Sequence, residues 1–147
     1  MKDIQEIQDE IAAEFEIYDD WIDKYNYLIE ISRDMTVIDS KNKVNDNLIS
    51  GCQSRVWLNA DYTGGRIYFT ADSDSIITKG IIALLIRVLS GRTPQEIINT
   101  DLNFIERIGL KQNLSPTRAN GLLSMIKQMK LYAFAYDVKA HTSQGGI

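Results

Sequence analysis

Cys52 is the residue with the clearest capacity for chemistry, since it is the only cysteine among the 147 residues. Gly51 before it allows the backbone to bend tightly, and the polar residues Gln53 and Ser54 follow it. Most free cysteines are small buried hydrophobic residues rather than nucleophiles. A thiol in a tight polar bend is nevertheless within reach of a partner, so the local sequence leaves a structural and a nucleophilic role for Cys52 equally open.

Three charged residues are further candidates for a role in such chemistry. Arg118 follows Ser115-Pro116 and falls in the first turn of a predicted helix. An arginine there, if close to Cys52, would stabilise a thiolate or the terminal sulfur of a persulfide, but the spacing alone does not bring the two side chains together. Asp72 and Asp74 most simply cap the helix that follows them. General acid or base catalysis is the alternative role for this pair.

The supply of metal ligands in the chain is small. Zinc and iron–sulfur sites usually need several cysteine or histidine ligands, and this chain has only Cys52 and His141. We therefore expect no metal and no other cofactor bound by this chain. One cysteine also excludes an intramolecular disulfide and a CxxC pair. A Cys-His hydrolase is disfavoured because His141 lies in a polar terminal segment.

Both ends of the chain show helical periodicity. Isoleucines and aromatic residues recur at helical spacing from residue 4 to residue 29, and the polar segment 40–46 is typical of a loop. The segment 76–88 is apolar on more than one face, which predicts the most buried helix, and Gly91 fits its end. Two further helices are predicted from proline-containing starts, which are Thr93-Pro94-Gln95-Glu96 and Ser115-Pro116.

The middle of the chain changes to a strand pattern. Residues 55–60 and 66–71 alternate between polar and apolar types on either side of Gly64-Gly65, which predicts an antiparallel hairpin. A short strand at 47–49 beside the hairpin would complete a three-stranded sheet. Cys52 would then lie in the bend between this strand and the hairpin.

These elements predict a single domain of the α+β class. In it, a small three-stranded antiparallel sheet packs with helices over residues 1–140, and a flexible tail follows at 141–147. Hydrophobic residues make up 44% of the chain and charged residues 24%, which is ordinary for a globular protein. No internal repeat or linker divides the sequence.

Charge is distributed unevenly along the chain. Residues 1–50 hold 13 acidic and 5 basic residues, whereas residues 51–147 hold 7 acidic and 11 basic residues. A solvated helix face is the simple explanation of the acidic part, and an electrostatic docking face for a protein partner is the alternative. The basic residues are scattered, so we do not expect nucleic-acid binding. The longest apolar run, Ile81 to Ile86, is too short to span a membrane, and no secretory signal is visible, which favours a cytoplasmic location.

Several short motifs occur in order and with compatible spacing between about Ile11 and Tyr132. They are Gly51-Cys52-Gln53-Ser54-x-Val56-Trp57-Leu58, Ile67-x-Phe69-x-Ala71-Asp72-Ser73-Asp74, Lys79-Gly80, Ser90-Gly91-x-Thr93-Pro94 and Ser115-Pro116-x-Arg118-x-Asn120-Gly121-Leu122. In this pattern the chain resembles the SufE family of sulfur-acceptor proteins. Ile49 stands where valine is usual, Ile31-Ser32 where a glycine is common, and 36–40 lacks the usual proline. These departures concern loop shape and leave the Cys52 and Arg118 motifs intact.

The resemblance implies a fold, a function and partners. The fold would be of the SufE/IscU type. Cys52 would accept sulfane sulfur as a persulfide from a cysteine desulfurase of the SufS type, stimulate that enzyme, and pass the sulfur on to an iron–sulfur scaffold. The chain would be an accessory protein and not an enzyme, with pyridoxal phosphate bound by the desulfurase. Arg118 would stabilise the sulfur on Cys52. The candidate partner-binding residues are Gly51, Gln53, Ser54, Asp72 and Asp74.

Two hypotheses follow from this mechanism. Docking should accelerate sulfur transfer more than a lowered thiol pKa can. A carrier should also hide its sulfur from small oxidants until it docks, and we expect Val56, Leu58 and the helix 76–88 to form an apolar shelter around Cys52.

Other functions would use the same residues differently. A thiol peroxidase or redox sensor would also need one activated cysteine, and it is the main alternative. A cluster scaffold would need more ligands than Cys52, and a ubiquitin-like sulfur carrier would not have Ile147 after Gly145-Gly146. An interaction protein without thiol chemistry would tolerate Cys52→Ala. Nothing in the sequence marks an obligate dimer interface, so we expect a monomer or a weak dimer.

Overall fold

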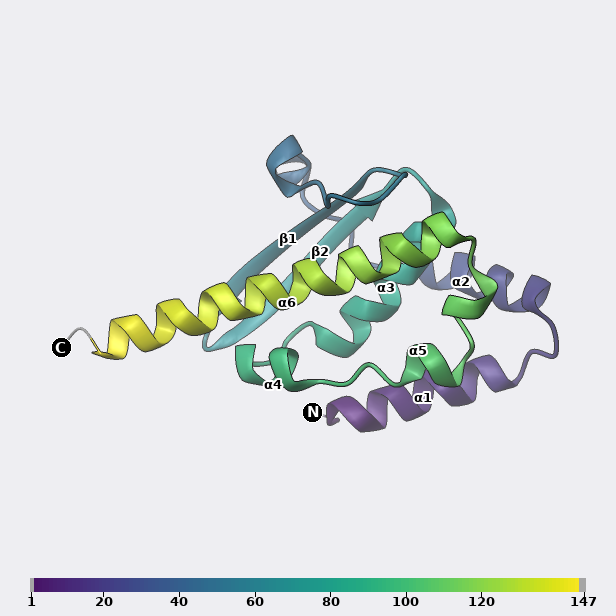
Figure 1. Ribbon diagram of the computed structural model, residues 1–147, viewed down its shortest axis with the longest axis horizontal. Helices are drawn as coiled ribbons and strands as arrows, with labels where there is room; N and C mark the ends of the chain where they lie inside the picture. Colours follow the sequence, from purple (N-terminus) through teal and green to yellow (C-terminus); the bar gives the residue numbers. More distant parts are fainter. Residues whose placement is uncertain (1, 146–147) are drawn as a thin grey trace.

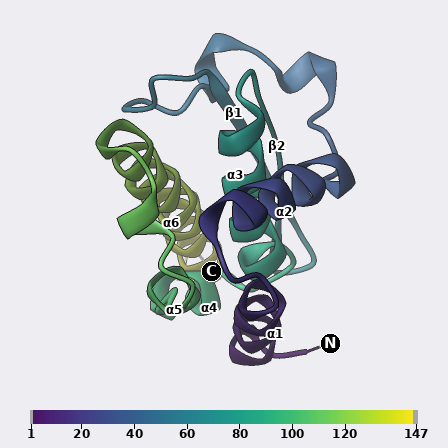
Figure 2. The same cartoon turned by 90° about the vertical axis from the view of Figure 1, so that its right-hand side faces the viewer.

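The computed structural model describes residues 2–145 and shows an α+β fold in which helices surround one antiparallel hairpin (Figures 1 and 2). The long last helix, α6, crosses the hairpin. The first two helices, α1 and α2, lie toward the side of the molecule opposite the carboxyl end of α6. The elements are α1 (Ile4–Glu16), α2 (Trp21–Asp34), η1 (Ser40–Asn42), η2 (Asn45–Asn47), β1 (Val56–Thr63), β2 (Arg66–Ser73), α3 (Ile76–Leu89), α4 (Pro94–Asn99), α5 (Phe104–Arg107), η3 (Lys111–Asn113) and α6 (Pro116–Gly145).

The sheet has two strands, so the prediction of three was wrong in number. β1 and β2 pair from Val56↔Ser73 to Thr63↔Arg66, and both glycines of the Gly64-Gly65 turn have positive φ, as the predicted tight hairpin requires. The expected third strand is reduced to a single bridge between Leu48 and Trp57. The 3-10 turn η2 ends at Asn47 and the chain bends again at Gly51, which leaves too few extended residues between them for a ladder.

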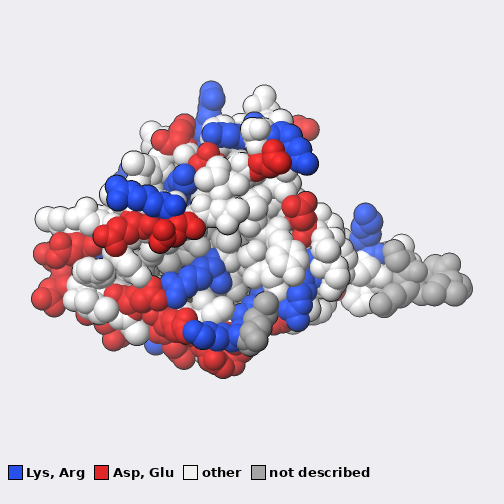
Figure 3. All heavy atoms as spheres, turned by 180° about the vertical axis from the view of Figure 1, so that it is seen from behind, with Lys and Arg blue, Asp and Glu red and all other residues white. Residues whose placement is uncertain are grey.

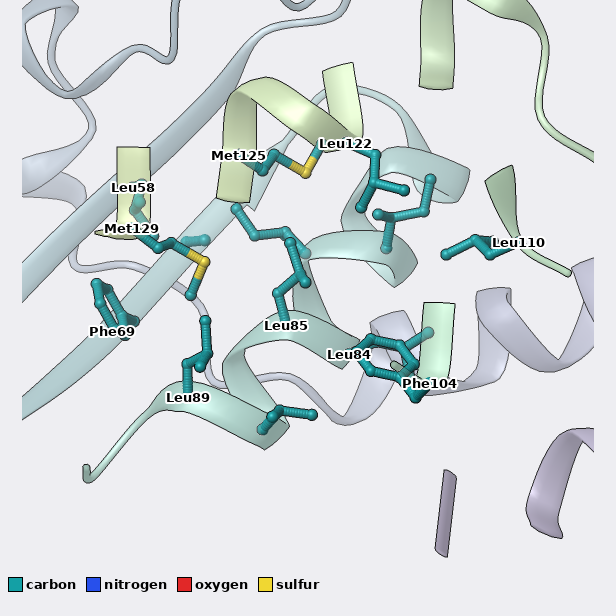
Figure 4. Close-up of a cluster of buried hydrophobic side chains, with 14 of the residues drawn as sticks. Leu58, Phe69, Leu84, Leu85, Leu89, Phe104, Leu110, Leu122, Met125 and Met129 are labelled. Atoms are coloured by element: carbon teal, nitrogen blue, oxygen red, sulfur yellow. The ribbon is translucent and has the colours of Figure 1, made fainter. Parts of the chain in front are cut away.

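The core lies between α3, the hairpin and α6. α3 is buried on several faces, as its sequence predicts, and its leucines meet side chains from β1, β2, α5 and α6. Figure 4 shows Met125 and Met129 of α6 in this cluster together with Leu85 and Leu89 of α3. This packing fixes the first turns of α3 and α6 relative to each other, and both turns line the pocket at Cys52.

The local signals for helix ends are confirmed, with one correction. Thr93 and Glu96 form the predicted capping box, and Gly91 follows α3 with a φ of +79°. Ser115 accepts a hydrogen bond from the Arg118 backbone N–H and so caps α6. The prediction that Asp72 and Asp74 cap α3 was wrong, because Ser75 is the N-cap and its side chain accepts from the Thr78 N–H.

The last helix is longer than the sequence pattern suggests. α6 continues through residues 141–145, which were expected to belong to the tail, while residues 146–147 lie outside the described residues. Flexibility of the tail stays a prediction. Within residues 2–145, no helix is both long enough and apolar enough to cross a membrane.

A charged cluster ties the first helices to the central one. Arg87 of α3 donates two hydrogen bonds to the Glu14 carboxylate of α1, at 2.8 Å and 2.5 Å, and the Tyr27 hydroxyl of α2 donates to the same carboxylate. The hydrogen bond from Arg87, which outweighs the opposing effect of partial burial, holds the pKa of Glu14 below its ordinary value. The charged form of Glu14 therefore stabilises the fold.

We expect Glu14→Gln to lower the free energy of unfolding at pH 7 by about 0.5–1 kcal/mol, a small value because the pair is partly screened by solvent. Since the pKa of Glu14 is lower in the folded than in the unfolded state, this contribution is present above the ordinary pKa of 4.5 and is lost as the pH falls through the folded value. Denaturant titrations of both proteins between pH 7 and pH 3 measure it. A difference between the two proteins that does not shrink with falling pH would contradict this assignment.

Candidate functional site

Cys52 lies in the bend that leads into β1, and this bend rests against α6. The Cys52 thiol donates a hydrogen bond to the Gly121 carbonyl oxygen, with 3.6 Å between sulfur and oxygen. Gly51 has a φ of +89°, and a Cβ placed on it would lie only 2.5 Å from the Ser124 Oγ. The positive φ favours glycine at position 51, and any larger residue there would also have to displace the Ser124 hydroxyl.

A pocket of about 280 Å³ opens beside Cys52, between the cysteine bend and the first turns of α3 and α6. It brings Cys52, Gln53 and Ser54 together with Arg118, a juxtaposition that the sequence could not give. In Figure 1 the first turns of α6 and the end of β2 lie at the same end of the molecule. The lining residues are Cys52, Gln53, Ser54, Thr78, Ile81, Ser115, Thr117, Arg118, Gly121 and Met125.

The thiol of Cys52 is not activated in this conformation. Cys52 is half-buried, and burial raises the pKa of its thiol above the ordinary value. Burial alone accounts for this shift, although Arg118 lines the same pocket. The thiol is therefore protonated at neutral pH, and a stabilising role of Arg118 stays a prediction for another state of the site.

The two candidate aspartates lie apart from the pocket lining and hold the surrounding loops. The Asp72 carboxylate forms ion pairs with the ammonium groups of Lys43 and Lys79, with N–O distances of 2.9 Å and 3.4 Å. Partial burial raises its pKa, but the hydrogen bonds from Lys43 and the Ser73 backbone outweigh this effect and leave the pKa below the ordinary value. Asp74 accepts a hydrogen bond from the Arg55 backbone N–H at 3.0 Å. Their partner-binding role stays a prediction, and their observed contacts are structural.

The shelter around Cys52 agrees with the expected one in part, because the helix 76–88 contributes Ile81 to it but Val56 and Leu58 do not line the pocket. Val56 and Leu58 are buried in the core, but the apolar walls of the pocket are Ile81 of α3 and Met125 of α6. Sequence reasoning also missed Thr78, which together with Lys79 interrupts the apolar first half of the predicted buried helix. The buried position of Thr78, beside a lysine that reaches the surface, was the available signal.

The acidic residues of the first third gather on the side of the molecule formed by α1 and α2 (Figure 3). Several of them are engaged within the fold, as Glu14 with Arg87 and Asp9 with Arg107 show. In the part of the chain that the structure describes, no group of three or more histidine, cysteine, aspartate or glutamate side chains is arranged to hold a metal ion.

Burial of the thiol predicts slow alkylation of Cys52. We expect iodoacetamide to react at least severalfold more slowly with the folded protein than with the unfolded chain at pH 7. The rate should rise with pH to a midpoint above the ordinary pKa of a cysteine. Gly51→Ala should accelerate the reaction, because the added Cβ pushes the bend away from Ser124.

Gly64→Ala is the matched control for the Gly51 variant. Gly64 also has a positive φ, of +60°, but a Cβ there would meet no atom within 4 Å. Both substitutions place alanine at a positive φ, but only the one at position 51 affects the cysteine bend. Equal acceleration in both variants would show that general destabilisation, and not displacement of the bend, exposes Cys52.

Fold and site define an α+β protein that shelters a single thiol in a pocket between two helix starts. Residues 9–133 match the SufE family, described as the Fe-S metabolism associated domain. The chain belongs to the SufE family, and thereby to a group of proteins associated with iron–sulfur metabolism.

Relatives with this domain occur in plants and bacteria. SufE-like protein 1, chloroplastic/mitochondrial, of Arabidopsis thaliana is 43% identical over 117 residues, which are 79% of this chain and 32% of that protein. This chain thus spans about a third of the plant relative. An uncharacterised SufE-like protein of Synechocystis is 33% identical over 92% of this chain and 85% of its own length. An uncharacterised SufE-like protein of Rhizobium meliloti is 35% identical over 83% of this chain and 91% of its own length.

A solved structure shares the fold. The solution structure of a hypothetical protein from Thermus thermophilus covers 88% of this chain, and the match spans 94% of that protein, with a TM-score of 0.72. Its sequence identity is 18%, so this likeness concerns the fold alone.

Proposed function

We propose that this protein is a sulfur carrier that accepts sulfane sulfur from a cysteine desulfurase onto Cys52, stimulates that enzyme, and delivers the sulfur for iron–sulfur cluster assembly. The observation that carries the proposal is the placement of the chain's single thiol in a pocket beside Arg118, in a chain of the SufE family. The pocket that Cys52 lines has a volume of about 280 Å³, which is ample for a second sulfur atom.

The transfer step is an exchange between sulfur atoms. The Cys52 thiolate attacks the outer sulfur of a persulfide on the desulfurase, and an S–S bond forms to Cys52. The S–S bond within the desulfurase persulfide breaks, and the desulfurase cysteine leaves as a thiolate. The electron pairs and the sulfane oxidation level are conserved, so the step needs no metal and no external oxidant or reductant.

In this proposal docking has to make the thiol reactive. Because burial keeps the Cys52 thiol protonated, the partner must expose the thiol or change its surroundings before attack. Gln53 and Arg118 are exposed at the mouth of the pocket, where a docked surface would meet them. In this proposal the chain binds no cofactor of its own, and pyridoxal phosphate is supplied by the desulfurase. The proposed location is the cytoplasm.

Sulfide release from free cysteine by a purified desulfurase tests the proposal. We expect the wild-type protein to stimulate the release and Cys52→Ser to abolish the stimulation. Mass spectrometry should find one added sulfur on Cys52 of the wild-type protein after turnover. Arg118→Lys should retain part of the stimulation, and Arg118→Ala should lose more of it.

Two outcomes would oppose the proposal. Full stimulation by Cys52→Ser would show that binding alone activates the desulfurase. Absence of the added sulfur together with rapid peroxide consumption would favour a thiol peroxidase or redox sensor.

A further inference from the structure

Thr78 is a buried polar residue whose hydroxyl is unused by the fold. It lies in the first turn of α3, where its backbone N–H is bound by the Ser75 side chain, and it is only 5% exposed. Its hydroxyl makes no hydrogen bond to any residue between 2 and 145. A hydroxyl left without a partner in such a position is costly unless it has a ligand or water to bind.

Thr78 lines the pocket that holds Cys52. Each fully enclosed side-chain nitrogen or oxygen in the described part of the chain has a hydrogen-bond partner. The unpaired oxygen of Thr78 is therefore not fully enclosed, and Thr78 is a lining residue of the Cys52 pocket. Ile81 and Met125 form apolar walls of the same pocket, so the hydroxyl is a polar donor at an otherwise apolar depth.

The electrostatics of this pocket favour an anion. Thr78 belongs to the first turn of α3, and Thr117 and Arg118 belong to the first turn of α6, so the positive ends of two helices meet there. Among the described residues that line the pocket, Arg118 supplies a positive charge and no carboxylate is present. Such a site stabilises a negatively charged sulfur but does little to stabilise a neutral thiol.

The persulfide on Cys52 would be such an anion. A hydropersulfide is a stronger acid than the corresponding thiol, and its terminal sulfur lies about 2 Å beyond Sγ. The thiol itself is bound to the Gly121 carbonyl, which is an acceptor and cannot stabilise a negative charge. The terminal sulfur therefore needs a different partner, and that partner must be a donor.

We propose that Thr78 positions the sulfur carried on Cys52: its hydroxyl donates a hydrogen bond to the terminal sulfur of the persulfide and favours the anionic form of that sulfur. This inference rests on the proposed function, because it takes the persulfide on Cys52 as the carried species. Thr78 thus distinguishes the loaded from the unloaded state, since the unloaded thiol is satisfied by Gly121.

The experiment loads Cys52 without a desulfurase. Inorganic polysulfide reacts with the Cys52 thiolate, which attacks a sulfane sulfur; an S–S bond forms to Cys52, and the shortened polysulfide leaves with the electron pair of the broken bond. After desalting, the near-ultraviolet absorption of the persulfide anion is followed against pH. We expect Thr78→Val to raise the pKa of the persulfide by about one unit, a tenfold decrease in its acid dissociation constant. Thr78→Ser, which keeps the hydroxyl, should stay close to the wild type.

The pKa of the unloaded thiol distinguishes a specific role of Thr78 from a merely structural one, which would shift the pKa of thiol and persulfide alike. Its pKa, from the pH dependence of alkylation, should change little in Thr78→Val. No shift of the persulfide pKa in Thr78→Val, or equal shifts of persulfide and thiol, would overturn the proposal. Because the resting thiol is sheltered, a wild-type protein that loads slowly when folded is loaded in denaturant and refolded before the titration. If Thr78→Val does not fold, Thr78→Ala is titrated in its place.

The two proposals fail separately. A persulfide shift in Thr78→Val without sulfur transfer from the desulfurase would support the role of Thr78 and count against the proposed function. Transfer from the desulfurase with no effect of Thr78→Val would do the reverse.

Discussion

Cys52 is expected to accept sulfur from a docked cysteine desulfurase at least about a thousandfold faster than from a small persulfide at the same concentration. The physical reason is that docking holds the two sulfur atoms in line for attack. Well-aligned intramolecular reactions reach effective molarities of about 10⁵ M or more, which is ample for a thousandfold acceleration. The resting thiol contributes little by itself, because it is half-buried and protonated.

Tuning of the thiol pKa could not replace docking. A fall in pKa from about 8.5 to about 7 raises the thiolate fraction at pH 7 from roughly 3% to about 50%. The same change lowers the intrinsic nucleophilicity about fivefold at a Brønsted slope of about 0.4–0.5, so the net gain is about threefold. Burial of Cys52 moves the pKa the other way, which removes even this gain in the resting state.

Rates of persulfide formation on Cys52 measure this expectation. Quenched samples with the desulfurase and with a small organic persulfide are compared by mass spectrometry, and Cys52→Ser gives the background. Equal second-order rates for the two donors would show that the thiol is reactive without docking. Alkylation of the wild-type protein that speeds up on adding desulfurase would add independent support for a thiol sheltered in the free protein.

Gly80→Ala is expected to lower the free energy of unfolding by about 1–3 kcal/mol, although alanine is the better helix former by about 1 kcal/mol. A Cβ at position 80 would lie 2.4 Å from the Leu28 carbonyl oxygen and 3.0 Å from its carbonyl carbon. These are backbone atoms of α2, so the clash is relieved only if α2 moves away from α3. That movement would loosen the packing of both helices in the core.

Gly121→Ala is the matched control for this prediction. Gly121 also lies within a helix, but a Cβ there would stand 3.5 Å from the Cys52 sulfur, an ordinary contact. We expect this variant to be as stable as the wild type or more so. Denaturant unfolding at pH 7 measures both proteins. A Gly80→Ala variant as stable as Gly121→Ala would show that α2 and α3 do not approach as closely as described.

The sequence by itself determined the features that depend on neighbouring residues. Alternating polar and apolar residues on either side of Gly64-Gly65 predicted the hairpin. Thr93 and Glu96 predicted a capping box, and Ser115-Pro116 predicted the start of α6. These signals are local, because helix caps and tight turns are formed by groups a few residues apart. The lone Cys52 and its flanking polar residues likewise marked the candidate site.

The sequence did not predict the correct local structure where a residue had more than one possible partner. Asp72 and Asp74 looked like helix caps, but Lys43 and the Arg55 backbone take up their carboxylates, and Ser75 caps α3. A strand at 47–49 was plausible in the sequence, but the turn η2 uses Asn47. In both cases residues close in sequence offered two local arrangements, and contacts with the rest of the fold selected one.

Only the tertiary structure decided what surrounds Cys52. Gly121 and Thr78 lie 69 and 26 residues from Cys52 along the chain, yet packing of α3 and α6 in the core brings both to its pocket. The same packing buries the thiol and raises its pKa, which no nearby residue in the sequence indicated. Burial and long-range contacts arise from how whole helices pack, and therefore the sequence identified the sulfur atom while the fold determined its protonation and its neighbours.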